Sequence, residues 1–177
     1  MKSTIAHIAT VFTLVLSTQC FADAGAINFK GNVVASACDI TVNGTSSADI
    51  NLGTWPTSTF KNTGDKSSPQ PFKLEVSKCN AGTYQFAFIG TADSDNPNLF
   101  KVSSAKGVGI GIATADGQTD VKINTTVSDS SNASLTTTGG EGAATGTLNL
   151  QAFYEATGAS VSAGDANANV RVTLQLK

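Results

Sequence analysis

Apolar residues recur at every second position along most of this chain, and this alternation limits the fold more than any other feature. Two clear cases are the apolar residues within segments 72–76 and 84–88. A period of two places alternate side chains on opposite faces of a strand, whereas a helix needs a period near 3.6. The pattern therefore predicts many short strands and almost no helix.

Turn residues divide the alternating stretches. Asn43-Gly44 and Asp116-Gly117 are dipeptides typical of two-residue hairpins. Residues 124–147 are rich in Ser, Thr and Gly, so we expect mainly loop there, with a weak edge strand around Ser134-Leu135. No repeat or linker divides the chain. Short strands at regular spacing then predict one all-β domain, a β-sandwich.

Two stretches predict close packing. Residues 107–112 alternate glycine with apolar residues but do not match the G-x-G-x-x-G nucleotide fingerprint. We expect a sheet face there on which other groups pack closely. Residues 54–64 have no regular pattern, and we expect Trp55-Pro56 and Phe60 to act as packing anchors.

The N-terminal residues have the pattern of an export signal. Met1-Lys2 gives a short basic start, and residues 5–16 form a mostly apolar run that is shorter than a bilayer span. Small residues satisfy the cleavage rule at Ala22 and again at Ala24. We expect a signal peptide over residues 1–22 and export of the rest.

The composition of the exported part excludes several kinds of function. The signal peptide contains the single histidine, His7, and the single methionine of the chain. Thirteen acidic residues outnumber eleven basic ones, of which Lys2 also belongs to the signal peptide. Nucleic-acid binding depends on a basic surface. We therefore expect no nucleic-acid partner.

Two cysteines, Cys38 and Cys79, remain in the exported part. An even number of cysteines in an exported chain favours a disulfide. Their spacing does not fit a CxxC-type metal or redox pair. We predict a Cys38–Cys79 bond, for which loop-closure entropy gives a stabilisation of roughly 4 kcal/mol.

Catalytic signatures are fragmentary. Triads of the Ser-His-Asp or Cys-His type need a base, and the exported part has no histidine. Ser58-x-x-Lys61 and Ser103-x-x-Lys106 match one β-lactamase motif, and residues 94–96 match a second, but no Lys-Thr-Gly completes the set. Neither Ser-x-x-Lys lies in a helical pattern that would bring both side chains to one face. We expect no enzyme activity.

Acidic residues in the segment 91–98 raise two further alternatives. Asp93 and Asp95 could form a carboxylate pair for glycoside cleavage, although loop carboxylates are far more often solvated. With Asn98 they faintly resemble a calcium loop, but an EF-hand needs glycine at that position and an acid where Ser104 stands. We expect a polar turn, with no metal and no cofactor.

Both ends of the exported chain alternate as strands do. In the N-terminal arm, Ile27, Phe29, Gly31 and Val33 share one face. The C-terminal set is Val170, Val172, Leu174 and Leu176. Exposed strand edges are normally protected because they recruit other chains. Two such strands suggest that recruiting another chain is the function.

Several motifs, in this order and spacing, resemble bacterial type 1 fimbrial subunits. The segments 27–38 and 72–79 each end in one of the two cysteines, and segments 86–90 and 108–112 fit the middle of that family. Near the C-terminus, the small-residue run beginning at Ala163 precedes an alternating strand. Gly164 stands at the position where the family keeps a glycine. The resemblance covers essentially the whole exported chain.

This resemblance implies an immunoglobulin-like β-sandwich that lacks its final strand. The missing strand leaves a hydrophobic acceptor groove beside the C-terminal strand. In the family, a periplasmic chaperone fills the groove first, and the N-terminal arm of the next subunit replaces it at an outer-membrane usher, a case of β-augmentation. The implied domains are a donor-strand extension over residues 23–36 and a pilin β-sandwich over residues 37–177.

The resemblance also implies roles for single residues. Ile27, Phe29 and Val33 would fill pockets of the groove, and Gly31 would lie where it is too tight for a side chain. A head-to-tail contact that does not close produces a filament. The implied function is a shaft or adaptor subunit of a fimbria on the bacterial surface, acting in cell adhesion. Leu176 departs from the family, which usually has an aromatic residue next to last.

A self-contained, secreted carbohydrate-binding sandwich is the alternative hypothesis. Lectin sites favour exposed aromatic side chains, and beyond phenylalanine the chain offers Trp55, Tyr84 and Tyr154. Such a protein would refold alone and stay monomeric.

Overall fold

The computed structural model describes residues 38–125 and 131–177, which form an all-β domain. The predicted signal peptide and the predicted donor arm lie outside these residues. The strands are β1 (Asp39–Val42), β2 (Gln70–Cys79), β3 (Gly82–Ile89), β4 (Phe100–Lys101), β5 (Val108–Thr114), β6 (Ser134–Thr137), β7 (Ala144–Ala156) and β8 (Arg171–Leu176). Within the described ranges, the only helical element is a 3-10 turn, η1 (Thr57–Thr59), and no helix could cross a membrane. The prediction of many strands and almost no helix is confirmed.

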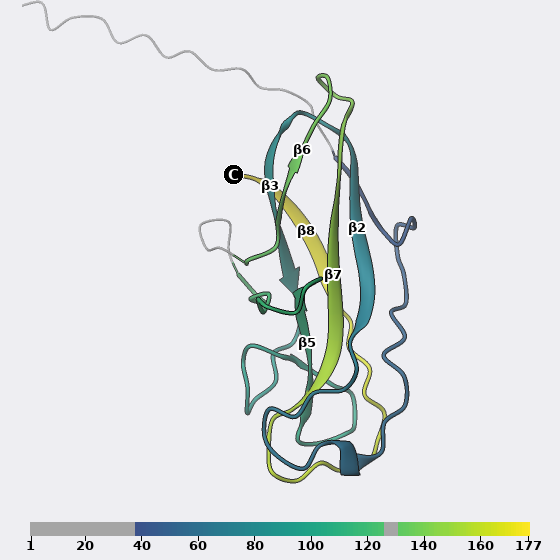
Figure 1. The fold of residues 1–177 in the computed structure, drawn as a ribbon, viewed down its shortest axis with the longest axis vertical. Coiled ribbons are helices and arrows are strands. Elements are labelled where there is room, and N and C mark those ends of the chain that lie inside the picture. Colours follow the sequence, from purple (N-terminus) through teal and green to yellow (C-terminus); the bar gives the residue numbers. More distant parts are fainter. Residues whose placement is uncertain (1–37, 126–130) are drawn as a thin grey trace, which may run out of the picture. The chain divides into compact units, whose positions relative to one another are not determined.

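The strands form two sheets (Figure 1). The larger sheet has the order β1-β2-β7-β5-β4 and the smaller one the order β6-β3-β8, with neighbouring strands antiparallel. The longest ladder joins β2 to β7, from Gln70 opposite Ala152 to Val76 opposite Gly146, and it is interrupted by a bulge before Cys79.

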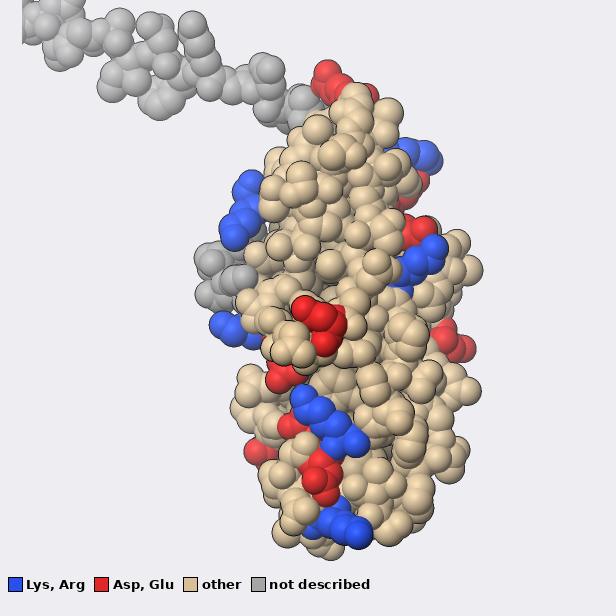
Figure 2. All heavy atoms as spheres, in the orientation of Figure 1, with Lys and Arg blue, Asp and Glu red and all other residues tan. Residues whose placement is uncertain are grey.

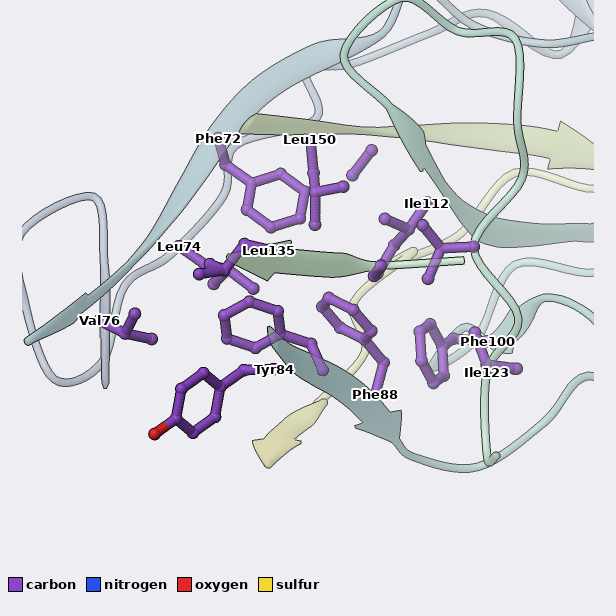
Figure 3. Packing of buried hydrophobic residues seen from close by; sticks show 14 of the residues in the cluster. Phe72, Leu74, Val76, Tyr84, Phe88, Phe100, Ile112, Ile123, Leu135 and Leu150 are labelled. Carbon is purple, nitrogen blue, oxygen red and sulfur yellow. The ribbon is translucent and has the colours of Figure 1, made fainter. Parts of the chain in front are cut away.

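The core lies between the two sheets, where the alternating residues of β2 and β3 face each other (Figure 3). Leu74 on β2 and Phe86 on β3 are fully buried. Burying a large apolar side chain stabilises a fold by about 1.5–3 kcal/mol. The alternation therefore fixes which face of each strand turns inward, because the opposite register would expose this whole set.

The predicted disulfide between Cys38 and Cys79 is present. It joins the residue before β1 to the last residue of β2, with a Cα–Cα distance of 4.7 Å. Beside it, Lys78 Nζ and the Asp39 carboxylate form an ion pair at 2.7 Å, and this hydrogen-bonded partner raises the pKa of Lys78. Both charged side chains are more than half exposed, so the covalent bond, not the ion pair, fastens this end of the domain.

Glycines of β5 allow close packing on the face of the sheet opposite the core, as predicted. A Cβ atom at Gly111 would lie 2.6 Å from Cε2 of Phe153, and one at Gly109 would lie 2.8 Å from Cβ of Leu99. Leu99 and Phe153 are both buried on this face. Lys66 covers the Phe153 ring, with Nζ 4.3 Å from its centroid.

One expectation about residues 124–147 is wrong. The weak edge strand is present as β6, but β7 begins at Ala144, within the stretch expected to be loop. A Cβ atom at Gly146 would lie 2.5 Å from Cδ1 of Leu135. The inward positions of β7 are therefore Ala144 and Gly146 because Leu135 fills the space above them. Small residues at these positions remove the alternation that would have shown the strand.

Candidate strand-binding site

β8 is an edge strand with one open side. It pairs with β3, and no described residue pairs with its other side in the sheet. The amide of Lys177 donates to the carbonyl of Thr83 at 2.9 Å. Alternate residues of an antiparallel strand face the same neighbour, so the backbone groups of Val172, Leu174 and Leu176 point toward the open side. This edge can pair with a further strand.

The apolar side chains of β8 are only partly covered. Val172 and Leu174 lie opposite two buried phenylalanines of β3 and pack on the core, yet both remain half-exposed. Val170, one residue before β8, is 37% exposed, and Leu176 is 60% exposed. The structure thus brings three predicted groove residues to one face of β8 and places Val170 immediately before it.

The larger sheet contributes a second apolar edge that the sequence analysis did not assign to the site. β1 is the edge strand of that sheet, and its Ile40 and Val42 are half-buried against the same core as Val172 and Leu174. Alternation of Ile40 with Val42 is the sequence signal for this edge. The predicted donor residues Ile27, Phe29, Gly31 and Val33 lie outside the described residues.

Gly164 lies where the chain leading to β8 is fixed to a neighbouring loop. A Cβ atom at Gly164 would lie 2.8 Å from the backbone N of Ala105 and 2.9 Å from Oγ of Ser104. The next carbonyl, that of Asp165, accepts hydrogen bonds from the amides of Ser104 and Ala105 at 2.8 and 3.0 Å and from Oγ of Ser103 at 2.8 Å. These bonds hold the segment before β8 in place.

We expect Gly164→Ala to destabilise the domain. The added methyl group must displace backbone atoms, and such overpacking typically costs about 1–3 kcal/mol. Urea unfolding of the mature subunit measures the change. Gly158→Ala is the matched control, because a Cβ atom there meets nothing within 4 Å. Equal midpoints for the two variants would contradict the close packing at Gly164.

A pocket lies close to the start of β8, at one end of the domain. This base pocket has a volume of about 590 Å³ and lies between residues 53–57, which precede Phe60, and residues 161–167. Phe60 is buried and Trp55 is half-buried beside it, so both act as the predicted packing anchors, whereas Pro56 is exposed. Tyr154 forms part of the floor, and burial raises the pKa of its phenol.

The catalytic and calcium alternatives find no supporting geometry among the described residues. Ser103 donates its hydroxyl to a backbone carbonyl, which gives it a structural role. Asp93 Oδ1 accepts hydrogen bonds from the amides of Asp95 and Asn96 at 2.9 and 3.2 Å, so it closes a polar turn. In the described ranges, no group of three or more His, Cys, Asp or Glu residues could hold a metal ion.

Fold and site together define a class of protein: an all-β sandwich with an open, apolar sheet edge. Residues 27–177 match the family described as "Fimbrial protein". A type-1 fimbrial protein subunit of Serratia marcescens is 32% identical over 100% of both chains. A fimbrial subunit type 1 of Salmonella typhimurium is 34% identical over 96% of this chain and 93% of its own. The chain therefore belongs to the fimbrial protein family.

Solved structures support the fold. The crystal structure of the P pilus rod subunit PapA has a TM-score of 0.59 at 19% identity, covering 78% of this chain and 99% of its own. A subunit from the structure of a chaperone-usher pilus has a TM-score of 0.60 at 20% identity, covering 91% of this chain and 100% of its own. These pilus subunits have the immunoglobulin-like fold, so the predicted fold class is confirmed.

Proposed function

We propose that this protein is a structural subunit of a chaperone-usher fimbria and polymerises head-to-tail by donor-strand exchange. The open edge of β8 is the observation that carries the proposal, because three of its residues direct backbone groups outward. In this scheme, residues 23–36 are the donor-strand extension of one copy, and residues 37–177 form the domain that accepts the next arm. The subunit passes through the periplasm, is held by a chaperone, and joins a surface fimbria at an outer-membrane usher as a shaft or adaptor subunit in adhesion.

Apolar side chains of the donor strand contribute binding free energy in addition to its backbone hydrogen bonds. A hydrogen bond contributes about 0.5–1.5 kcal/mol net, whereas complete burial of a large apolar side chain contributes about 1.5–3 kcal/mol. Ile27, Phe29 and Val33 therefore add binding free energy of the same order as the backbone hydrogen bonds when they cover the half-buried Val172 and Leu174. The exposed Leu176 offers further apolar surface at the end of the edge.

The two ends of the domain set the direction of the donor strand. Leu176 lies opposite Tyr84, near the disulfide, and Arg171 lies opposite Ile89 at the far end of β3. In this scheme the arm of each copy precedes Cys38, at the disulfide end, so that end is already joined to one neighbouring copy. The next copy must therefore approach the other end, and its arm runs antiparallel to β8. Ile27 then lies near Leu176 and Val33 near Val170.

Cross-linking tests this proposal, including whose sheet the arm joins. Lys30 alternates with the donor residues, as Thr173 alternates with the apolar residues of β8, so the two side chains share the outer face. Engineered cysteines can bond when their Cα atoms are about 4.4–6.8 Å apart. In isolated polymers, Lys30→Cys with Thr173→Cys should give a ladder of covalent multimers on a non-reducing gel, which Lys30→Cys alone should not give.

The other outcomes contradict the proposal. A cross-link within a single chain would show that the arm completes its own domain. No cross-link with Thr173→Cys, even when the arm cysteine is moved to Asn28 or Asn32, would show that the arm does not pair with β8.

A further inference from the structure

The base pocket lies on the path of a donor strand after it has passed β8. Residues 161–167 line the pocket and are separated from the start of β8 by three residues, so the pocket lies close to the open edge, beyond Arg171. The pocket is at the opposite end of the domain from the disulfide. Its lining residue Tyr154 is near the Gln70 end of β2, whereas Cys79 ends the same strand at the disulfide (Figure 1).

The polar atoms of the pocket aromatics are already satisfied within the domain. Trp55 Nε1 donates to the carbonyl of Leu52 at 2.8 Å, and the Tyr154 hydroxyl donates to the carbonyl of Ala166 at 3.0 Å. Their rings therefore present apolar surface to the pocket, beside Phe60 and Val108. Such a surface favours a small, uncharged occupant.

We propose that the base pocket holds residues 34–37 of the next copy, the short segment between its donor strand and its Cys38. This inference rests on the proposed donor-strand exchange and names a contact beyond the strand pairing. Antiparallel pairing that places Val33 beside Val170 brings Ser36 and Ala37 beside Asn167 and Ala166, two residues of the pocket. The segment Val-Ala-Ser-Ala has no charge and no large side chain.

Because this segment is short, the two copies that it joins must lie close together. Four extended residues span at most about 13–14 Å. Cys38 of the donor copy is fixed by its disulfide to the end of its own β2, so it cannot move away from its domain. The disulfide end of one copy must therefore lie against the base pocket of the copy before it. The pocket thereby sets the spacing between successive subunits.

Surface charge allows this approach. On the face shown in Figure 2, charged side chains of both signs lie among a larger uncharged surface, and several acidic and basic groups are adjacent. Among the pocket-lining residues, Asp165 is the only charged one. Two ends of like charge would repel each other across a short gap, and no such accumulation borders the pocket.

Trp55 provides an intrinsic fluorescence probe of the pocket, because it is the single tryptophan of the chain. Intrinsic fluorescence of isolated polymers is compared with that of the unassembled mature subunit. We expect the emission maximum of the polymer to shift to shorter wavelength and its quenching by acrylamide to fall, because residues 34–37 of the neighbour cover Trp55. An unchanged spectrum and unchanged quenching in assembled polymers would overturn the inference.

A second measurement avoids dependence on one fluorophore. Ser36→Cys with Asn167→Cys, in the lining of the pocket, should give a covalent ladder in polymers. Ser36→Cys with Ser94→Cys is the matched control, because Ser94 is an exposed serine outside the pocket. Equal cross-linking of both pairs, or of neither, would overturn the inference.

The two proposals fail in different ways. A Lys30–Thr173 ladder without a Ser36–Asn167 ladder leaves donor-strand exchange intact and removes the pocket contact. Absence of both ladders overturns both proposals. A change in Trp55 fluorescence when free sugars are added to the unassembled subunit would assign the pocket to a carbohydrate and also overturn the inference.

Discussion

We expect deletion of residues 23–33 to abolish fimbriae while leaving a subunit that still folds and binds the proposed chaperone. The described domain keeps its disulfide, its core and the open edge of β8 without these residues. What it loses is the apolar strand that would cover Val172 and Leu174 of another copy. The shortened subunit can accept an arm but cannot donate one, so it ends a polymer. Electron microscopy of cells and co-purification with the chaperone measure the two effects.

A matched variant separates the effect of the apolar side chains of the arm from the effect of its length. Substituting Ile27, Phe29 and Val33 together by Ser keeps the arm but removes its apolar side chains, and it should fail in the same way. Substituting Asn28, Lys30 and Asn32 by Ser changes the other face of the arm and should assemble normally. Normal fimbriae from the shortened chain would refute the donor role of the arm.

Leu174→Asp should eliminate stable subunit from the periplasm. Leu174 lies opposite Phe86 and packs on the core, and a carboxylate there would lose much of its hydration as any strand covers it. An unpaired buried polar or charged group costs several kcal/mol, which is comparable to the whole stability of a small domain, about 5–15 kcal/mol. Immunoblots of periplasmic extracts made under non-reducing conditions measure the amount of oxidised subunit.

Arg171→Asp is the control for this substitution. It places the same carboxylate on the same strand, but at an exposed position on the opposite face. We expect close to normal yield, because surface substitutions away from special features usually change stability by about 0.5 kcal/mol or less. Equal yields of the two variants would mean that the core-facing side of β8 is not buried during chaperone binding or assembly.

The aromatic side chains argue against the carbohydrate-binding alternative. Tyr84 is buried, and its hydroxyl donates to the carbonyl of Asn80 at 3.1 Å. Trp55 and Tyr154 also donate to backbone carbonyls of their own domain. A small-molecule site needs a few polar groups that are free to fix the orientation of the ligand. In this domain, the polar atoms of all three candidates are engaged in fixing its own loops.

Strand prediction from the sequence succeeds where both alternating faces are distinct. β2 and β8 are clear because large apolar residues turn inward while polar residues turn outward. The start of β7 is missed because Ala144 and Gly146 must be small beneath Leu135, so the inward face carries no large apolar residue. When a neighbouring side chain requires small residues on the inward face of a strand, the sequence of that strand shows little alternation.

The candidate site could be predicted only in part for a similar reason. The apolar residues of β8 lie close together in the sequence, so their alternation predicts this face. The base pocket joins residues 53–60 to residues 161–167, which no periodicity connects. Gly164 is predicted by the resemblance alone. Its physical role depends on close contact with the backbone of Ala105, which belongs to a distant segment of the chain.

The Cys38–Cys79 bond also determines how a subunit would carry tension. A pull on the arm enters the domain at Cys38, crosses directly to Cys79, and reaches β3, the partner of β8, after two intervening residues. Without the bond, the same pull would load the short ladder between β1 and β2. Peeling that ladder would release the chain from Cys38 to the start of β2 at Gln70, a separation of 32 residues, because β2 stays paired with β7. At about 3.3–3.6 Å per residue, this is roughly 110 Å of slack per subunit. The disulfide therefore makes the subunit a nearly inextensible link, so that stretching force is borne by the pairing between copies.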